Sequence, residues 1–442
     1  MVQPRHVLPH HHPGPGRGRG APGGLRRGRA SVQHLLRRRR PHPGRRRRAP
    51  ARLLPGRLRA VRLAARRRAG GRQHAGGARP RAVQRPPEDR GGDGGALRVT
   101  DAARVAVVGA RGTIAGVAAT RVSFHRYESG LLSAAEMADA LRPELDEVAE
   151  VTAADFAGDH HTVAGLCALT RTVERTPADA VVVTTGTNEL AELAYWLHLT
   201  LSRARPVVVT GALRPWTVIG SDGPANLYNA VLLAASGRTR PHGVVVMLND
   251  EILAARDAVK SDTVRTHAFQ SPGAGRLGTI DAARIRLQRV PVPDDRWTPF
   301  ETSPEEIPKV EIVPGYLDAG PETLLAVANT GAAGIVLSGP LSPRQKRAAR
   351  TLAGNGLTFV AAPHTNTGAA YPQEDAVIGT DLHPPKARLL LMLTLTCAKT
   401  PAEAKQIFTR ESPLPVPGED YAPRTSGEGV SLSRPVARNV VR

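Results

Sequence analysis

The chain has 442 residues, enough for two domains that each bury a hydrophobic core. Its net charge of +22 comes from residues 1–98, which hold 27 arginines, no lysine and three acidic residues. Residues 99–442 contain 34 basic and 36 acidic residues, so the overall charge gives no indication of a nucleic-acid ligand for this larger part. No apolar run is long enough to span a bilayer, and no secretory signal is recognisable, which predicts a cytoplasmic protein.

The two cysteines, Cys167 and Cys397, are too few for a disulfide framework. Both lie in apolar stretches with helical character, where an unpaired thiol behaves as a small hydrophobic group. We therefore expect two buried structural thiols that form no disulfide framework.

Residues 1–98 are dominated by Gly, Pro and Arg, with little patterned apolar surface, so we expect this segment to be disordered. One interpretation is an RNA- or DNA-binding arm. The other, which we favour, is that the segment is not part of the protein. Arginine without lysine, and no acid before Glu88, is typical of a GC-rich upstream region translated from a start placed too early, with the true start near Val99 or Val105.

From residue 104 onward, short β-branched runs alternate with longer amphipathic segments. Runs that are apolar on both faces predict buried strands at 104–110, 179–186, 205–212 and 242–248. Helices are predicted at 133–141, 188–201 and 221–235. Ser133 and Asp222 are the expected N-caps, and Pro224 lies in a first turn. This alternation predicts an α/β fold with a parallel sheet covered on both sides.

A Pro-rich and acid-rich stretch, Val290–Pro308, is the expected linker between two domains. We place an N-terminal domain at 99–300 and a smaller C-terminal domain at 308–412, followed by a loose tail at 413–442. In the second domain the alternation resumes, with strand-like runs at 309–315, 334–340 and 357–363 and helices at 342–353 and 384–395.

Three segments that follow predicted strands carry small hydroxyl, glycine or basic residues: Gly109–Gly116, Thr184–Leu190 and Arg256–Thr263. In open parallel sheets, ligands bind at the carboxyl ends of strands, where such loops lie. The glycine turn at Thr184–Leu190 precedes a helix, so its backbone N–H groups can hold a carboxylate or an oxyanion. A lone lysine such as Lys260 is more often a solvated surface residue.

The motifs GTIAG, TGT, VVVTGALRP, SDGPANLYNA, LNDEI and RDAVK, in this order, closely resemble those of the L-asparaginase/glutaminase family. The resemblance continues through IVPGYLDA, GIVLSGP and HPPKARLLLMLTLT, and covers about residues 104–411. It implies the two-domain, Rossmann- or flavodoxin-like asparaginase architecture. It also implies hydrolysis of L-asparagine to L-aspartate and ammonia without cofactor or metal, at sites between the subunits of a homodimer or homotetramer.

By this resemblance, Thr113 matches the primary nucleophile, which forms an acyl-enzyme, and Tyr127 matches the tyrosine that activates it. Thr187 matches the second catalytic threonine, and Lys260 the lysine that polarises it. A lysine acts as a base only if its site lowers its pKa. Closure of the loop from Thr113 to Tyr127 would exclude water. The substrate-binding positions that the family pattern implies are Gly112, Gly158, Asp159, Gly186 and Asn188.

Several positions depart from the family pattern. Arg111 replaces a glycine, which strains the backbone if that position needs a positive φ. Asn188 replaces the acid that, by resemblance, holds the substrate's α-ammonium group. Gly158 and Asp159 align with a Ser-Gln type pair, and Asp159 either supplies the missing carboxylate or is a simple loop acid. We expect the adjacent His160 and His161 to lie on the surface.

Two further departures concern the C-terminal domain. Ser338–Pro343 lacks the family's asparagine, and Glu374 is the candidate for an acid contributed across the subunit interface. Asn188 keeps two alternatives open: an amidohydrolase acting on another small amide, one without a free α-ammonium group, and a catalytically weak binding protein.

Overall fold

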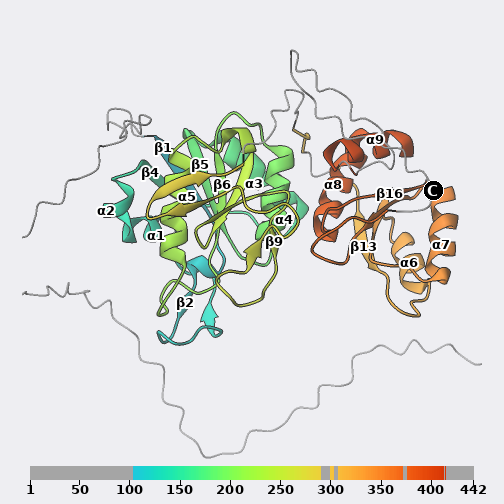
Figure 1. Ribbon diagram of the computed structural model, residues 1–442, viewed down its shortest axis with the longest axis horizontal. Coiled ribbons are helices and arrows are strands. Elements are labelled where there is room, and N and C mark those ends of the chain that lie inside the picture. Colours follow the sequence, from blue (N-terminus) through green and yellow to red (C-terminus); the bar gives the residue numbers. More distant parts are fainter. Residues whose placement is uncertain (1–102, 290–298, 303–306, 372–375, 413, 415–442) are drawn as a thin grey trace, which may run out of the picture. The chain divides into compact units, whose positions relative to one another are not determined.

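The computed structural model describes residues 103–289, 299–302, 307–371, 376–412 and 414 (Figure 1). The segment predicted at 1–98, most of the expected linker and Glu374 lie outside the described residues. So does the predicted tail, apart from residue 414. Two sheets with helices against them form the described part, and none of its helices is long and apolar enough to cross a membrane.

An eight-stranded sheet, with the order β12-β11-β8-β7-β6-β5-β1-β4, forms the larger unit. Its strands are β1 (Arg104–Ala110), β4 (Glu150–Asp155), β5 (Ala180–Thr185), β6 (Val207–Thr210), β7 (Val244–Leu248), β8 (Glu251–Ala254), β11 (Gly278–Asp281) and β12 (Arg284–Leu287). The five strands from β4 to β7 are parallel, as the two-sided apolar runs predict. All four strands predicted in this half of the chain are present.

The edge beyond β7 is antiparallel, which the sequence analysis did not anticipate. Asn249 and Asp250 connect β7 to β8, and both have positive φ. Ala282 and Ala283 do the same between β11 and β12. Two consecutive residues with positive φ form the tight turn that matches the twist of a hairpin, so the chain reverses here without a crossover helix.

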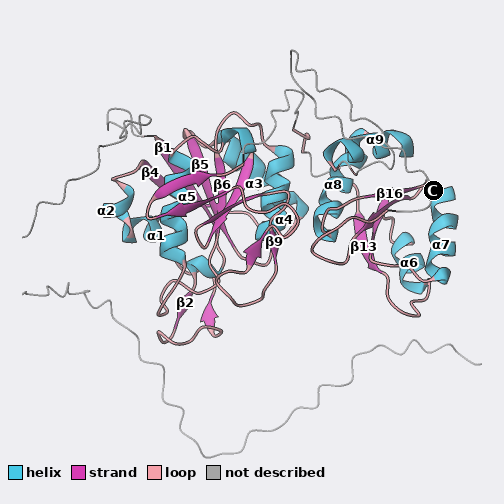
Figure 2. Cartoon of the chain, in the orientation of Figure 1, coloured by secondary structure: helices cyan, strands magenta, loops and turns pink. Residues whose placement is uncertain are grey.

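Helices cover both faces of this sheet (Figure 2). They are α1 (Ala134–Ala140), α2 (Arg142–Leu145), α3 (Val163–Arg175), α4 (Leu190–Thr200) and α5 (Gly223–Ala235). Val181 and Val183 of β5 pack in one core with α3 and α4, whereas Val182 packs in a second core with α1 and α5. Because alternate side chains of a strand point to opposite faces, both faces are buried and the continuous valine run is explained.

The smaller sheet has four parallel strands, in the order β13-β14-β15-β16. These are β13 (Val310–Pro314), β14 (Gly334–Ser338), β15 (Thr358–Ala362) and β16 (Val377–Gly379). Its helices are α6 (Glu322–Ala328), α7 (Pro343–Gly354), α8 (Pro384–Cys397) and α9 (Pro401–Glu411). Two short hairpins belong to the larger unit: β2 (Val117–Ala118) with β3 (Tyr127–Glu128), and β9 (Val259–Lys260) with β10 (Phe269–Gln270).

One lysine ties the two sheets together. Lys386, fully buried on α8, donates hydrogen bonds through Nζ to the carbonyl oxygens of Ala255, Arg256 and Ala258, at 2.8, 2.8 and 2.5 Å. Arg256 also forms an ion pair with Asp381 at 2.6 Å. These contacts fix the loop that leads directly into β9, and β9 carries Lys260.

Two local expectations are corrected by the packing. Cys167 is buried, but Cys397 is exposed, because it lies in the last turn of α8 where the apolar contacts of that helix end. Ser133 caps α1 with a reciprocal capping box, as predicted. Asp222 stands at the N-cap position of α5, yet its carboxylate accepts the N–H groups of Leu213 and Arg214 and makes no cap bond.

Candidate active site

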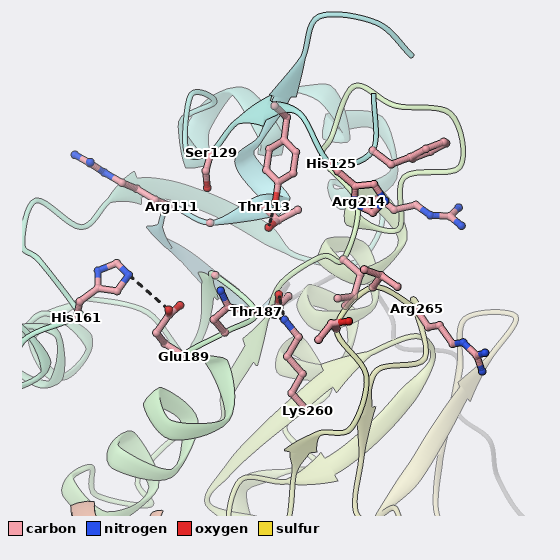
Figure 3. A pocket seen from close by; sticks show the side chains of 18 of the residues that line it. Arg111, Thr113, His125, Ser129, His161, Thr187, Glu189, Arg214, Lys260 and Arg265 are labelled. Atoms are coloured by element: carbon pink, nitrogen blue, oxygen red, sulfur yellow. Dashed lines mark hydrogen bonds and ion pairs between the residues drawn. The ribbon is translucent and has the colours of Figure 1, made fainter. Parts of the chain in front are cut away.

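A cavity of about 860 Å³ opens at the carboxyl ends of β1 and β5 (Figure 3). β1 lies between β4 and β5, so the chain leaves β1 toward one neighbour and later returns on the other side. The loop after β1 leads to helices on one face of the sheet, and the loop after β5 leads to α4 on the other. Because these two adjacent loops lead to opposite faces of the sheet, a crevice forms between them, and doubly wound sheets bind ligands in such a crevice.

Thr113 begins a single 3₁₀ turn directly after β1, and its side chain is nearly buried. Its Oγ1 lies 2.8 Å from the hydroxyl of Tyr127, and either atom can be the donor. Tyr127 is placed by the β2–β3 hairpin, whose pairing brings the end of the loop back beside its start. A threonine and a tyrosine fourteen residues apart thus share one hydrogen bond at the cavity wall.

The turns after β1 and β5 approach each other closely at two glycines. Gly112 has φ 94°, and a Cβ built on it would lie 2.3 Å from the backbone nitrogen of Gly186. A side chain would therefore push the two turns apart, so only glycine fits at residue 112. This contact holds Thr113 and Thr187, the residues that follow the two glycines, at one mouth of the sheet.

Lys260 faces the second threonine from β9 (Figure 3). Its Nζ donates to Thr187 Oγ1 at 3.0 Å and to Asn188 Oδ1 at 2.8 Å. Partial burial lowers the pKa of Lys260, and the charges of Glu189 and Asp262 oppose that shift. A hydroxyl next to an amine whose pKa is lowered can be deprotonated, which is what a threonine needs to become a nucleophile.

Arg111 occupies the left-handed region of the backbone, with φ 58°. The condition under which arginine strains this position is therefore met. For a residue with a Cβ this conformation costs about 1–2 kcal/mol. The strain lies two residues before Thr113, in the loop that forms the cavity wall.

Seven of the nine predicted site residues line the cavity: Gly112, Thr113, Tyr127, Gly186, Thr187, Asn188 and Lys260. Gly158 and Asp159 are not among the lining residues. The carboxylate of Asp159 is exposed and accepts hydrogen bonds from the backbone N–H and Nδ1 of His161. The prediction of a surface position is wrong for His160, which is buried, and holds for His161, which is exposed.

Phe124, Glu189, Arg214 and Arg265 are among the lining residues that were not predicted from the sequence. Arg214 follows β6, so its position after a strand end was a usable signal. Its guanidinium lies 5.5 Å from the ring centre of Phe124, a cation–π contact between the loop after β6 and the segment between β2 and β3. Glu189 is the one carboxylate among the lining residues.

The segment between β2 and β3 is also held by its backbone. Ala118 N–H donates to Thr217 Oγ1 at 2.9 Å, and Ile219 N–H donates to the carbonyl of Arg121 at 2.8 Å. These bonds attach the loop that carries Tyr127 to the loop after β6. The cavity is therefore closed on this side by a segment with few buried apolar contacts, the kind of element that can open and close.

The fold and the cavity define a two-domain α/β protein whose site combines two alcohol side chains with a partly buried amine. Residues 104–293 match the family model described as Asparaginase, N-terminal, and residues 309–408 match that of the Glutaminase/Asparaginase C-terminal domain. The chain belongs to the asparaginase family.

The chain is similar to L-asparaginase 2 of Bacillus subtilis, with 32% identity over 70% of this chain and 86% of the relative. It is also 33% identical to a probable periplasmic L-asparaginase of Haemophilus influenzae, over 70% of this chain and 93% of the relative. Among solved structures, the probable cytoplasmic L-asparaginase of Campylobacter jejuni superimposes with a TM-score of 0.65 at 33% identity. That match covers 69% of this chain and 99% of the other.

Proposed function

We propose that this protein hydrolyses the side-chain amide of L-asparagine to L-aspartate and ammonia. The observation that carries the proposal is the pairing of each threonine hydroxyl with its own partner in one cavity: Thr113 with Tyr127 and Thr187 with Lys260. Similarity to proteins named L-asparaginase supports the choice of substrate.

In the proposed mechanism, Thr113 Oγ1 bonds to the carbonyl carbon of the amide while its proton passes to the Tyr127 hydroxyl, which gives up its own proton toward the amide nitrogen. The C–N bond then breaks, and the nitrogen leaves as ammonia with the proton that Tyr127 released. Water attacks the resulting ester, releases the carboxylate product and restores the threonine hydroxyl. The backbone N–H groups at the start of α4, next to Thr187, are suited to stabilise the oxyanion of each tetrahedral intermediate.

Thr187 and Lys260 supply the second hydroxyl and a base in this proposal. The lowered pKa of Lys260 favours the neutral amine that can accept a proton. Asn188 offers its amide oxygen to the same Nζ and so positions the amine without a negative charge. A carboxylate there would stabilise the ammonium form instead.

We also infer that the substrate is a small amide, that the reaction itself uses no cofactor or metal, and that the protein forms a homodimer or homotetramer. The domain boundaries at 99–300 and 308–412 stay predictions. The cytoplasmic location also stays a prediction, since the names of the relatives include both a periplasmic and a cytoplasmic protein.

One assay tests the proposal: ammonia release from L-asparagine, L-glutamine and amides without an α-amino group, measured with the full chain. We expect asparagine to be hydrolysed and Thr113→Ala to abolish at least 99% of that activity, since removal of a nucleophile leaves little of the rate enhancement. Thr120→Ala, a change at an exposed threonine of the same loop, is the control and should retain activity. An active Thr113→Ala variant would refute the nucleophile assignment.

A second candidate substrate class rests on the charge of the cavity. Lys260, Arg111, Arg214 and Arg265 line it, against the single carboxylate of Glu189. This balance attracts anions. It favours ω-amides of dicarboxylic acids, which bring a carboxylate and no ammonium group. Faster hydrolysis of such amides than of asparagine in the same assay would establish this class.

A further inference from the structure

Two histidines and one glutamate gather at one side of the cavity. His160 and His161 lie on the loop between β4 and α3, and Glu189 stands at the N-cap position of α4. One ligand-type atom from each side chain lies within 4.8 Å of the other two. All three residues line the same cavity as Thr187 and Lys260, and none takes part in a step of the proposed hydrolysis.

His160 is the buried member of this cluster. Its side chain is 6% exposed, and its Nε2 has no hydrogen-bond partner. A buried polar atom without a partner destabilises the fold, so it calls for an explanation. Burial lowers the pKa of His160, and the nearby His161 adds to that shift.

His161 is oriented by a carboxylate. Its Nδ1 lies 2.9 Å from Asp159 Oδ1, so in the neutral ring the proton is on Nδ1 and the lone pair is on Nε2. A histidine that ligates a metal usually donates its other N–H to a carboxylate in this manner. Asp159, which does not line the cavity, thus gains a role as the group that fixes this ring.

The separation of His161 and Glu189 also fits an intervening ion. His161 Nε2 lies 3.9 Å from Glu189 Oε1, too far for a hydrogen bond (Figure 3). Ligand atoms at about 2.0–2.2 Å from a tetrahedral zinc ion lie about 3.3 Å from one another. His161 and Glu189 are partly exposed, so small side-chain rotations bring them into that range.

We propose that His160, His161 and Glu189 bind a divalent transition-metal ion of the zinc class at the edge of the active-site cavity. Two imidazoles and one carboxylate are three protein ligands, a set that suits zinc and leaves coordination positions open. Because the ligands line the cavity, a carboxylate or amine of a small molecule in the cavity can occupy an open position. The positive charge of such an ion would offset the negative charge of Glu189, which raises the pKa of Lys260.

The competing interpretation is an ion pair between protonated His161 and Glu189 without metal. The two are separated by titrating the chelator-treated full chain with Zn²⁺ by calorimetry and with Co²⁺ by visible absorption. We expect one site whose affinity falls at least 10-fold in His161→Ala and in Glu189→Gln, as for loss of a ligand. Zn²⁺ should raise the melting temperature of the unmodified protein and not that of the variants.

His267→Ala is the matched control, because His267 also faces a glutamate, Glu251, at 3.6 Å but lies outside the cavity. This variant should bind Zn²⁺ like the unmodified protein. Residues 1–98 contain further histidines, and the binding that remains in His161→Ala and Glu189→Gln measures metal held there. Absence of binding, or binding that His161→Ala and Glu189→Gln leave unchanged, overturns the proposal. No asparaginase activity is needed for this readout, so it stands apart from the proposed hydrolysis.

Discussion

Lys386 and Lys260 are both shielded from water, one fully and one partly, but they have different hydrogen-bond partners. Lys386, at the junction of the two sheets, is fully buried and directs its three N–H bonds to three backbone carbonyls. Lys260, at the cavity edge, is half-buried and meets a hydroxyl and an amide oxygen. Burial lowers the pKa of both, to about 7 for Lys386, which also lies 5.6 Å from the ring centre of Tyr195.

This difference indicates that the amine of Lys386 has a structural role and the amine of Lys260 a chemical one. Three carbonyl acceptors use every N–H of the Lys386 ammonium group, so this side chain fastens the loop from Ala255 to Ala258. The bonds of Lys260 go to groups that can exchange a proton or yield to a substrate. One lysine thus holds the loop whose continuation presents the other. Changes at the junction should cost stability, and changes at the cavity edge should cost activity.

The largest effect is expected from Lys260→Met. Loss of the base should lower kcat/KM for the preferred amide by about 10²–10⁴-fold, the range for a general acid or base. The melting temperature should change little, because the side chain is half-exposed and Thr187 can turn to water. Steady-state kinetics and thermal unfolding measure the two quantities. A variant with normal kcat/KM would remove Lys260 from the chemistry.

Lys386→Met should instead lower the stability of the fold more than it lowers kcat/KM. Three carbonyl oxygens lose their donor in a buried place, which lowers the free energy of unfolding by about 3 kcal/mol. Urea denaturation gives this value, and Lys346→Met on the exposed face of α7 is the control with no expected loss. The comparison of the two lysines fails if Lys386→Met is as stable as the control.

Asn188→Asp sharpens the electrostatic side of the comparison. The carboxylate would lie where the amide oxygen now accepts from Lys260 Nζ at 2.8 Å, and it would raise the pKa of Lys260. The neutral amine then appears only at higher pH. We expect the rise of kcat/KM with pH to move to higher pH than in the unmodified protein, whose Lys260 has a lowered pKa. An unchanged pH profile would show that the rate does not depend on the ionisation of Lys260.

Arg111→Gly should give the smallest effect, and it should be a gain. Glycine adopts φ 58° without strain, so removal of the side chain stabilises the fold by about 0.5–1 kcal/mol after its larger chain entropy is counted. Arg126→Gly, at a position of the same loop with negative φ, should destabilise it instead. Equal effects in the two variants would mean that no strain is stored at the cavity edge.

Several strands and one helix cap of this protein can be predicted from local sequence. The β-branched runs of β1, β5, β6 and β7 and the capping box at Ser133 are local signals, and the structure has them where predicted. The motifs that follow β1 and β5 also indicated Thr113 and Thr187 as neighbours, because the carboxyl ends of adjacent parallel strands meet at one edge of a sheet. Lys260 lies on β9, after the antiparallel strand β8, and only the family resemblance indicated it.

Other features depend on contacts that no local pattern encodes. His160 is buried although its neighbours Asp159 and His161 in the same loop are exposed. Arg214 contacts Phe124 because the loop after β6 is bonded to the segment that carries Tyr127. The antiparallel edge had a local signal at Asn249 and Asp250, which the sequence analysis treated only as part of a motif.

The sequence by itself determined the α/β architecture, the family and the two hydroxyl-bearing turns, because strand periodicity and glycine turns are set by neighbouring residues. Tertiary structure decided which charges share the cavity, since a pKa and a hydrogen-bond partner depend on groups brought together from separate elements. Glu189 beside two histidines and Lys386 beneath the loop of Lys260 are both products of that second level.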